Sequence, residues 1–368
     1  HYPCLSNYNY LNQASLGLIG EPAVQAMTDF LHNTARFGNL KMSDQEEIEF
    51  FDPLRENAAK LLNTTKEKIA IIGSSSEMLS QLPLIFKPKA NSKILVVSSD
   101  FPAITRPWIS YSKHNNCKIN FIDEIPCESL TDTIIKNIDS ETAVVAISLV
   151  QFSTGTRINP YKLREATKNV GAKLILDATQ AAGAMPIESD NYNADVIVCS
   201  GYKWLGGHGG VGIAAISNEF LKKDPVMAGW MGASNPFDMQ PKKLLYAKDA
   251  RKFTQSTMSY ISIKGLEIAI KEVIDLNLET IKTHSQKLAT ILANGIKESK
   301  WQPYRSINDK CASSHIISLE SQSAGTARTL EKLKKENIVC GTRNNRLRVS
   351  IAHFNNETDI MSLVEALF

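Results

Sequence analysis

One aspartate and one lysine lie at the ends of apolar runs, where α/β proteins commonly carry their reactive side chains. Asp177 ends an apolar run at residues 174–176, and Lys203 closely follows another apolar run at 196–199. Both runs are short, rich in branched aliphatic residues and bounded by Gly, Asp or Ser, and a third run at 211–216 follows a glycine-rich stretch. This pattern predicts three buried strands. Reactive groups of open α/β sheets lie at strand ends, so we expect Asp177 and Lys203 in one active site.

A lysine amine and a carboxylate are the two protein groups that the cofactor pyridoxal phosphate (PLP) needs for catalysis. The amine can form a Schiff base with the cofactor's aldehyde, and a carboxylate against the pyridine nitrogen keeps it protonated, so that the ring accepts electrons. Gln180 lies three residues after Asp177 and can hydrogen-bond the phenolic oxygen of the ring, while Ser200 and Tyr202 offer hydroxyls for the phosphate. The alternative is a structural aspartate and a solvated lysine. The additional polar residues favour PLP.

The segment D-A-T-Q…S-G-Y-K-W-L, from Asp177 to Leu205, resembles the D-x-x-Q…S-x-x-K signature of the class V aminotransferase family. This family includes cysteine desulfurases, selenocysteine lyases, isopenicillin N epimerase and kynureninase. The resemblance implies the α/β fold of PLP-dependent transferases of fold type I. We expect a large PLP-binding domain at residues 18–257, with a mostly parallel sheet of the seven-stranded type. A small α+β domain would combine residues 1–17 with 258–368.

The local pattern predicts the elements that carry these residues. A helix is expected over 45–62 with a break at Pro53, and two long helices are expected over 259–277 and 278–299. Pro160 opens a further helix that ends near residue 169. Besides the three strands described above, further strands are expected at 69–72, 93–98, 142–150, 314–319 and 347–350.

The turn G-S-S-S-E at residues 73–77 follows an expected strand and opens an expected helix. Backbone N–H groups at a helix N-terminus favour an anion, and serine hydroxyls add donors, so the turn can hold a phosphate. The alternative is a plain serine N-cap. The turn also matches the position of the family's G-T-T-E turn, which implies phosphate contacts by Ser74, Ser75 and Ser76.

Four more stretches resemble segments of the family. D-F-P-A-I-T-R-P-W implies that Phe101 stacks on the PLP ring, where desulfurases carry a histidine, although a core phenylalanine is the alternative. V-Q-F-S-T-G implies that Ser153 faces the cofactor, and F-T-Q-S-T-M-S-Y implies that Thr257 reaches the phosphate of a neighbouring subunit. There Ser256 and Met258 replace the family's Gly and Pro. M-A-G-W-M-G places Trp230 at the substrate pocket, or in simple packing.

The two ends of the chain resemble the substrate-binding segments of the family. Y-L-N-Q-A-S-L-G implies that Asn12 and Ala14 line the substrate pocket. R-L-R-V-S-I-A-H-F-N-N implies that Arg348 binds the substrate α-carboxylate, with Arg346 as its competitor. A guanidinium fork suits bidentate binding of a carboxylate. The expected partners are therefore an amino-acid substrate and, from the family and from the prevalence of symmetric dimers, a second copy of the chain with the sites at the interface.

Composition limits the other function classes. The chain has 368 residues, 21% charged and 43% hydrophobic, with a net charge of only +3, which argues against nucleic-acid or membrane binding. The six cysteines lack C-x-x-C spacing and do not cluster with histidines, so we expect free thiols, a cytoplasmic location and no metal site. G-H-G-G-V-G at 207–212 matches a dinucleotide fingerprint formally, but it precedes an expected strand where that fingerprint opens a helix.

The position of Cys340 limits which reactions are expected once PLP is bound. A desulfurase of this family carries its nucleophilic cysteine on a mobile loop just before the R-x-S motif. Here Cys340 ends an apolar run and lies shortly before Arg346, which leaves no such loop. We therefore expect C–S lyase or desulfurase-like chemistry without a persulfide-forming cysteine. Aminotransferase and epimerase activities remain as alternatives, and a PLP-binding protein without catalysis is the alternative outside the enzymes.

Overall fold

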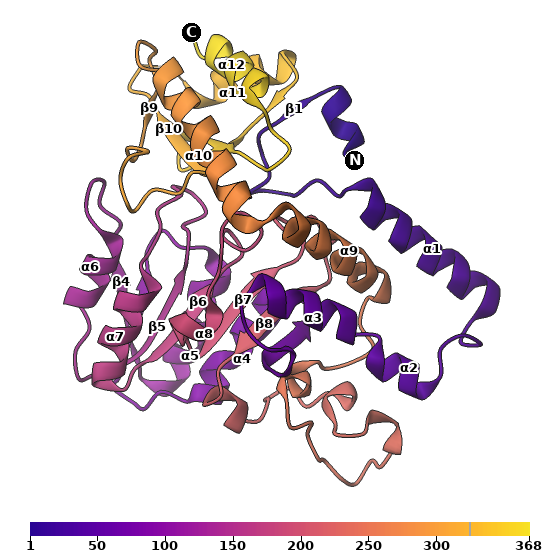
Figure 1. Ribbon diagram of the computed structural model, residues 1–368. Helices are drawn as coiled ribbons and strands as arrows, with labels where there is room; N and C mark the ends of the chain where they lie inside the picture. Colours follow the sequence, from indigo (N-terminus) through magenta and orange to yellow (C-terminus); the bar gives the residue numbers. More distant parts are fainter. Residues whose placement is uncertain (324) are drawn as a thin grey trace.

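The computed structural model describes residues 1–323 and 325–368. A large layered domain carries a smaller C-terminal domain at one end (Figure 1). The large sheet has seven strands in the order β2-β8-β7-β6-β5-β3-β4, which confirms the predicted α/β fold. Its strands are β2 (Ile69–Ile72), β3 (Lys93–Val97), β4 (Lys118–Ile122), β5 (Thr142–Ser148), β6 (Lys173–Asp177), β7 (Val196–Ser200) and β8 (Gly212–Ile216).

Only β8 runs antiparallel to its two neighbours, and every other pair in this sheet is parallel. The strands are buried on both faces, except the edge strand β4, whose residues are mostly exposed or half-buried. In β2, for example, Ile69 and Ile71 enter one hydrophobic core, whereas Ala70 and Ile72 enter the other. Strands covered on both faces read as continuous apolar runs, which is why they could be predicted.

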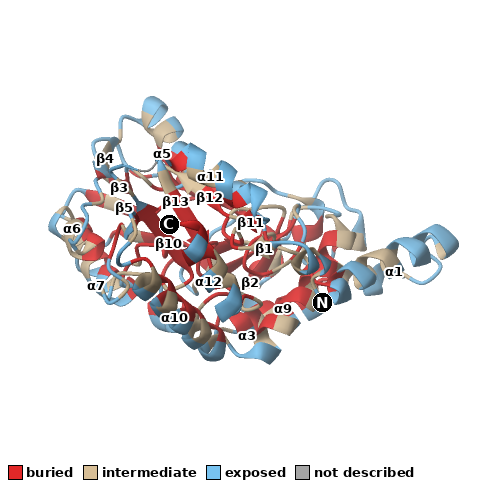
Figure 2. Ribbon diagram, turned by 90° about the horizontal axis from the view of Figure 1, so that it is seen from above, coloured by how far each residue is buried: buried red, intermediate tan, exposed pale blue. Residues whose placement is uncertain are grey.

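Helices cover both faces of the large sheet. One core contains residues from α3 (Asp52–Leu61), α6 (Leu130–Lys136), α7 (Pro160–Val170), α8 (Ser189–Tyr192) and α9 (Tyr260–Leu276). The other contains residues from α4 (Ser75–Phe86) and α5 (Pro102–Asn115). Helix α1 (Glu21–Phe37) packs on α9 and projects outward with most of its surface exposed (Figure 2).

The expected helix over 45–62 is two helices, α2 (Asp44–Glu49) and α3. The chain breaks at Phe50 and Phe51, and Pro53 lies in the first turn of α3 rather than at a kink. A proline is tolerated there because first-turn N–H groups have no partner within the helix. The capping box between Ser43 and Glu46 fixes the start of α2.

The C-terminal part forms a four-stranded antiparallel sheet in the order β12-β13-β10-β9. Its strands are β9 (Gln302–Pro303), β10 (Ile316–Glu320), β12 (Gly341–Arg343) and β13 (Arg346–Ser350). The N-terminal β1 (Asn9–Tyr10) pairs in parallel with β11 (Ile338–Val339), which attaches the start of the chain to this part. Its core is shared with α10 (Leu278–Gly295), α11 (Thr326–Lys335) and α12 (Glu357–Ala366).

Helix α9 connects the two parts of the molecule. Its buried residues Ile263, Leu266 and Ile270 belong to the core of the large sheet, although they follow residue 257. The first helix that packs in the smaller core is α10, through Leu288 and Leu292. Among the described residues, no helix is both long and apolar enough to cross a membrane.

Candidate active site

Polar residues gather where the central strands of the large sheet end. Asp177 is the last residue of β6 and the Cα partner of Ser148, the last residue of β5. Ser200 ends β7, and Lys203 follows in a turn. Carboxyl ends of parallel strands are the usual ligand site of α/β sheets. Residues from these ends and the adjoining loops line one cavity: Ser74, Ser75, Ser76, Phe101, Ala103, Ser148, Phe152, Asp177, Thr179, Gln180, Ser200, Tyr202 and Lys203.

The turn that carries Lys203 is held by the N-terminal segment. The Lys203 carbonyl oxygen accepts a hydrogen bond of 3.0 Å from Gln13 Nε2, and the Gly17 N–H donates to the Tyr202 carbonyl at 2.9 Å. A Cβ atom at Gly17 would lie 2.0 Å from the Lys203 carbonyl oxygen, so only glycine allows this approach. The backbone at Lys203 is therefore fixed, and its side chain is the part that can move.

The Lys203 amine is buried among aromatic rings. Its Nζ lies 5.2 Å from the ring centroid of Phe101 and 5.7 Å from that of Tyr202. Burial lowers the pKa of Lys203 to about 8, the negative charge of Asp177 opposes this shift, and two nearby guanidinium groups add to it. A lysine amine with a lowered pKa is a nucleophile and a proton acceptor near neutral pH.

Asp177 presents a buried carboxylate to the same cavity. Its Oδ1 accepts a hydrogen bond of 2.8 Å from the Thr179 N–H. Burial raises the pKa of Asp177, whereas the Thr179 hydrogen bonds and the positive charge of Lys203 lower it. A buried carboxylate needs a cationic partner, and a protonated pyridine nitrogen would be one.

Three serines at the start of α4 line the cavity. Ser74 caps the helix, since its Oγ accepts a hydrogen bond of 3.1 Å from the Glu77 N–H. The hydroxyls of Ser75 and Ser200 are 2.9 Å apart. First-turn N–H groups have no acceptor within a helix, so those of Ser75 and Ser76 are available to an anion. The serine cap and the phosphate site, weighed as alternatives from the sequence, are therefore compatible.

A buried carboxylate fixes Phe101. The Phe101 N–H donates a hydrogen bond of 2.7 Å to Asp100 Oδ1. Asp100 also accepts hydrogen bonds from the Ser148 N–H at 2.8 Å, the Ser148 hydroxyl at 2.6 Å and Gln151 Nε2 at 3.1 Å. The Phe101 ring meets that of Phe152 edge-on, with centroids 5.4 Å apart. Phe101 is thus positioned at the cavity before any ligand binds.

Gln180 connects the site to the N-terminal segment. Its Oε1 accepts a hydrogen bond of 2.8 Å from Trp204 Nε1, and its Nε2 donates to the Ala14 carbonyl at 3.1 Å. One N–H of the amide is left for a cofactor oxygen. Ala14 is buried and contacts Gln180 through its backbone carbonyl, and its place at the substrate stays a prediction.

Arg348 lies on β13 and is completely buried. Its Nη1 donates to the Phe152 carbonyl at 2.7 Å, and its Nη2 donates to Ser15 Oγ at 2.5 Å. Asn12 forms a β-bridge with Ser350 on the same strand. Among the described residues, the buried Arg348 Nε and Asn12 Oδ1 have no hydrogen-bond partner. Both atoms therefore keep unused hydrogen-bonding capacity.

Six predicted site residues do not line this cavity: Asn12, Ala14 and Arg348, described above, and Ser153, Trp230 and Thr257. Ser153 is fully buried, and its Oγ has no partner in the described chain. Trp230 is 38% exposed and meets Phe237 edge-on, with ring centroids 5.4 Å apart. Thr257 is exposed. Their roles at the cofactor or substrate stay predictions.

The cavity also contains residues that the sequence did not single out. Thr179 belongs to the D-A-T-Q motif and could have been chosen from it, since its Oγ accepts a hydrogen bond of 3.1 Å from the Ser200 N–H. Ser148 is placed there by the register of β5 with β6. Phe152 is adjacent to the predicted Ser153, and Ala103 lies two residues after the predicted Phe101. No motif or spacing in the sequence pointed to either of them.

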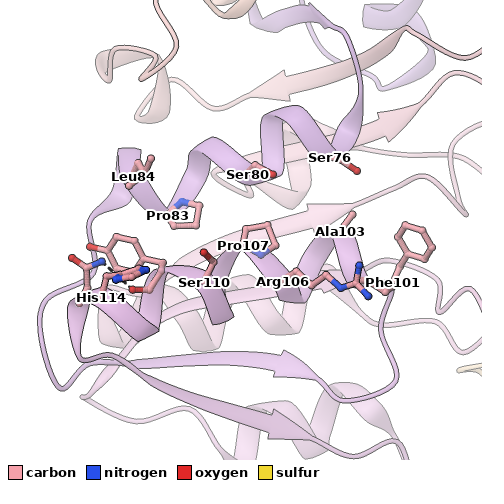
Figure 3. Close-up of a pocket in the computed structure, with 13 residues that line it drawn as sticks. Ser76, Ser80, Pro83, Leu84, Phe101, Ala103, Arg106, Pro107, Ser110 and His114 are labelled. Carbon is pink, nitrogen blue, oxygen red and sulfur yellow. Dashed lines mark hydrogen bonds between the residues drawn. The ribbon is translucent and has the colours of Figure 1, made fainter.

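A groove of about 730 Å³ between α4 and α5 adjoins the cavity. Ser76 and Phe101 line both. Figure 3 shows Ser80, Pro83 and Leu84 on one side of the groove, facing Pro107, Ser110 and His114 on the other. Leu84 is 47% exposed, so an apolar surface continues from the site to the outside.

The glycine run at 207–212 leads directly into β8, not into a helix. His208 within it is exposed. A dinucleotide fingerprint places pyrophosphate at the start of a helix, so this run lacks the geometry of that site. Cys340 lies between β11 and β12, and burial raises its pKa to about 12.

The cavity has the groups that PLP requires of a protein. A lysine amine can reach the aldehyde, a buried carboxylate can pair with the ring nitrogen, and a helix N-terminus with serine hydroxyls can hold the phosphate. The chemistry of this set of donors and acceptors fits the cofactor.

Comparison with known proteins agrees with this geometry. The chain is 23% identical to the uncharacterized aminotransferase YcbU of Bacillus subtilis over 372 residues, which covers 100% of this chain and 95% of the relative. Other similar proteins are named as cysteine desulfurases and kynureninases. Among solved structures, the cystine C-S lyase C-DES has a TM-score of 0.89 at 18% identity, covering 100% of this chain and 99% of that one. The Escherichia coli cysteine desulfurase CsdA has a TM-score of 0.86 at 19% identity, covering 99% and 95%.

The fold and its cavity define a PLP-dependent enzyme of fold type I. The model of the family named Aminotransferase class-V matches residues 9–363. The chain therefore belongs to the class V aminotransferases.

Proposed function

We propose that this enzyme cleaves the carbon–sulfur bond of a sulfur-containing amino acid by β-elimination, without a persulfide on one of its own cysteines. The net reaction consumes the amino acid and water and releases pyruvate, ammonia and a thiol. The observation that carries the proposal is the combination of a cavity that contains Lys203, Asp177 and the serines of the α4 N-terminus with a deeply buried Cys340.

The residues of the chain have separate tasks in this reaction. When bound, PLP withdraws electrons from the α-carbon of the amino acid. Lys203 would hold the cofactor through its Nζ, and its free amine would take the proton from the α-carbon, for which a pKa of about 8 is suitable. Asp177 holds a proton on the pyridine nitrogen. Arg348 binds the α-carboxylate and thereby orients the substrate.

The position of Cys340 supports elimination without sulfur transfer to the protein. A desulfurase needs a thiolate that reaches the substrate sulfur. Cys340 is only 7% exposed, belongs to the small-domain core and has a pKa raised to about 12, so its thiol stays protonated at neutral pH. It lies between β11 and β12, two short strands that leave no long loop to move it.

Product analysis tests the proposal. Purified protein with PLP is incubated with S-substituted L-cysteines, L-cysteine, L-alanine and a 2-oxo acid, and pyruvate, thiol, new amino acids and enantiomers are measured. Pyruvate and thiol in equal amounts from S-substituted cysteines support the lyase. Amino-group transfer to the 2-oxo acid, or the opposite enantiomer without pyruvate, would replace it with an aminotransferase or an epimerase. The absence of every product would indicate a PLP-binding protein without catalysis.

We also propose a homodimer in which Thr257 reaches the PLP phosphate of the partner. Thr257 is exposed, outside its own chain's cavity, and follows a segment with several exposed apolar side chains: Val226, Met227, Trp230, Met239, Leu244 and Leu245. A partner subunit packed on this segment would cover these side chains. Trp230 would then stand at the mouth of a neighbouring site. A strict monomer with full activity in sedimentation and assay would overturn this arrangement.

Two further assignments are part of the proposal. We propose a large domain of residues 18–257 and a small domain of residues 1–17 with 258–368, in which α9 belongs to the small domain by sequence but packs in the core of the large sheet. A cytoplasmic location is supported by the six cysteines, which are all unpaired. Limited proteolysis near residue 257 and fractionation of cells would test these two assignments.

A further inference from the structure

Two arginines stand side by side close to Lys203. Arg348 lies on β13 and Arg343 ends the neighbouring strand β12. Arg348 Nη2 and Arg343 Nη2 donate to the same acceptor, Ser15 Oγ, at 2.5 Å and 3.3 Å. Both guanidinium groups are close enough to Lys203 for their charges to lower its pKa, beside the larger effect of burial. We call Arg343 and Arg348 the arginine pair.

The arginine pair has no carboxylate partner among the residues that the structure describes. Within the described ranges, neither guanidinium forms an ion pair, and their hydrogen bonds go to neutral oxygens. The adjacent Arg346, by contrast, pairs with Glu320 at 3.2 Å and lies 4.0 Å from the ring centroid of Tyr304. Burial, and then the charge of Arg343, lower the pKa of Arg348 to about 9. The two positive charges therefore destabilise each other until anions bind.

The donors that remain exceed what one carboxylate can use. Arg348 keeps a buried Nε without a partner besides the second hydrogens of its two Nη atoms. Arg343 donates one N–H to the Thr342 carbonyl at 2.7 Å and one to Ser15, so three of its five N–H groups remain without an acceptor. A carboxylate typically binds one guanidinium fork through two parallel hydrogen bonds.

The two arginines also differ in depth. Arg348 is completely buried, whereas Arg343 is half-buried at the edge strand β12. The phosphate site expected at the start of α4 uses other residues, Ser74, Ser75 and Ser76, so the cofactor's phosphate already has donors elsewhere. An anion at Arg343 would come from the outer part of the substrate.

We propose that Arg343 binds a second acidic group on the side chain of the amino-acid substrate, so that the enzyme selects amino acids with an anionic side chain. This inference rests on the proposed function in one respect: Arg348 must hold the α-carboxylate of an amino acid at PLP. It names the substrate class of that site. The predicted substrates are S-substituted cysteines whose substituent ends in a carboxylate, and the same preference extends to the binding of other acidic amino acids.

Paired ligands that differ only in one charge test the proposal. S-carboxymethyl-L-cysteine is compared with S-carbamoylmethyl-L-cysteine, and L-glutamate with L-glutamine. Binding to the PLP-loaded protein is measured by the change in cofactor absorbance and independently by calorimetry. We expect the acidic member of the thioether pair to bind roughly tenfold to a hundredfold more tightly, which is the range for a charge-assisted hydrogen bond.

Three variants identify the residue. Arg343→Gln should remove the preference while leaving the Kd of the neutral ligand unchanged, and Arg343→Lys should restore part of it, because a lysine keeps the charge but not the fork. Arg346→Gln is the matched control on the adjacent strand, and it should keep the full preference. Circular dichroism and thermal unfolding verify that each variant is folded.

Each outcome decides the proposal. Equal binding of acidic and neutral ligands by the wild-type protein overturns it, as does a preference that persists in Arg343→Gln. Equal weakening of both ligands by Arg343→Gln also overturns it, since Arg343 would then serve the α-carboxylate. A protein whose cofactor spectrum responds to no amino acid refutes the proposed function as well, whereas a response without charge discrimination refutes this inference alone.

Discussion

The two sides of the active site differ in how their charges are balanced. On the cofactor side, formed by Asp177 and Lys203 at the ends of β6 and β7, a carboxylate and an amine of opposite charge moderate each other's pKa. On the proposed substrate side, formed by the arginine pair of β12 and β13, two like charges stand together without a carboxylate partner in the described parts of the chain. The cofactor side suits a ligand with both a positive and a negative group, such as PLP. The arginine pair suits a substrate with negatively charged groups.

The difference follows from the elements that build each side. Asp177 ends a central parallel strand, and Lys203 lies in a turn clamped by Gln13 and Gly17, so both are fixed by the large sheet and the N-terminal segment. The arginines lie on short antiparallel strands near the edge of the smaller sheet. Substitutions on the cofactor side should therefore affect turnover most, and those on the substrate side should affect binding.

The largest effect is expected for Asp177→Asn. Without the carboxylate, the ring nitrogen loses its proton, and turnover should fall about 10² to 10⁴-fold, comparable to losing a general acid or base. The measurement is kcat per bound PLP. Asp195→Asn is the control, since Asp195 is an equally buried carboxylate that pairs with Arg164 and Lys173 away from the cavity. Near-normal turnover in Asp177→Asn would contradict the assignment of the cofactor side.

On the substrate side, Arg348→Gln should weaken amino-acid binding about tenfold to a hundredfold, because it removes a charge-assisted fork. The content of bound PLP should not change. Titration of cofactor absorbance gives the Kd, and Arg346→Gln on the same strand serves as control. Loss of PLP with unchanged amino-acid binding would exchange the roles of the two sides.

The lowered pKa of Lys203 gives a pH dependence. The amine must be neutral to attack the PLP aldehyde, and with a pKa of about 8 it is neutral above that pH. The rate of PLP uptake by the apoprotein should rise about tenfold per pH unit below pH 8 and level off above it. If Lys203 had the pKa of an exposed lysine, the rate of PLP uptake would continue to rise up to about pH 10. Such a profile would show that burial does not lower the pKa of Lys203.

The smallest effect on activity is expected for Cys340→Ala. The buried thiol contacts the small-domain core and no part of the cavity, so its removal should cost stability by about 1 kcal/mol and leave product formation from S-substituted cysteines unchanged. Thermal unfolding and initial rates are measured on the same preparation. Loss of sulfur release together with a persulfide mapped to Cys340 in the wild type would indicate a desulfurase instead.

The sequence was sufficient for the elements with buried or periodic patterns. Strands β5, β6 and β7 could be predicted because both of their faces are apolar. Strand β4 was missed because it is an edge strand with alternating, partly exposed residues such as Asn120 and Phe121. The break before α3 was displaced from Pro53, since a proline begins a helix as readily as it ends one.

For the site, local motifs identified residues that lie in one cavity, but they could not reveal what approaches from far away in sequence. Gln13 holds the backbone of Lys203 across 190 positions of the chain. Arg343 was not singled out, because only the pairing of β12 with β13 brings it to Ser15 beside Arg348. Such contacts arise from tertiary packing and leave no spacing signal.

The most direct test of the account is to identify the lysine that holds PLP. Purified protein is treated with borohydride, digested, and analysed by mass spectrometry for the phosphopyridoxyl group, alongside Lys203→Ala and a control such as Lys223→Ala, whose lysine is exposed. The account predicts modification of Lys203 alone in the wild type and in Lys223→Ala, and none in Lys203→Ala. Stoichiometric modification at another lysine, or reduced cofactor retained by Lys203→Ala, would contradict it.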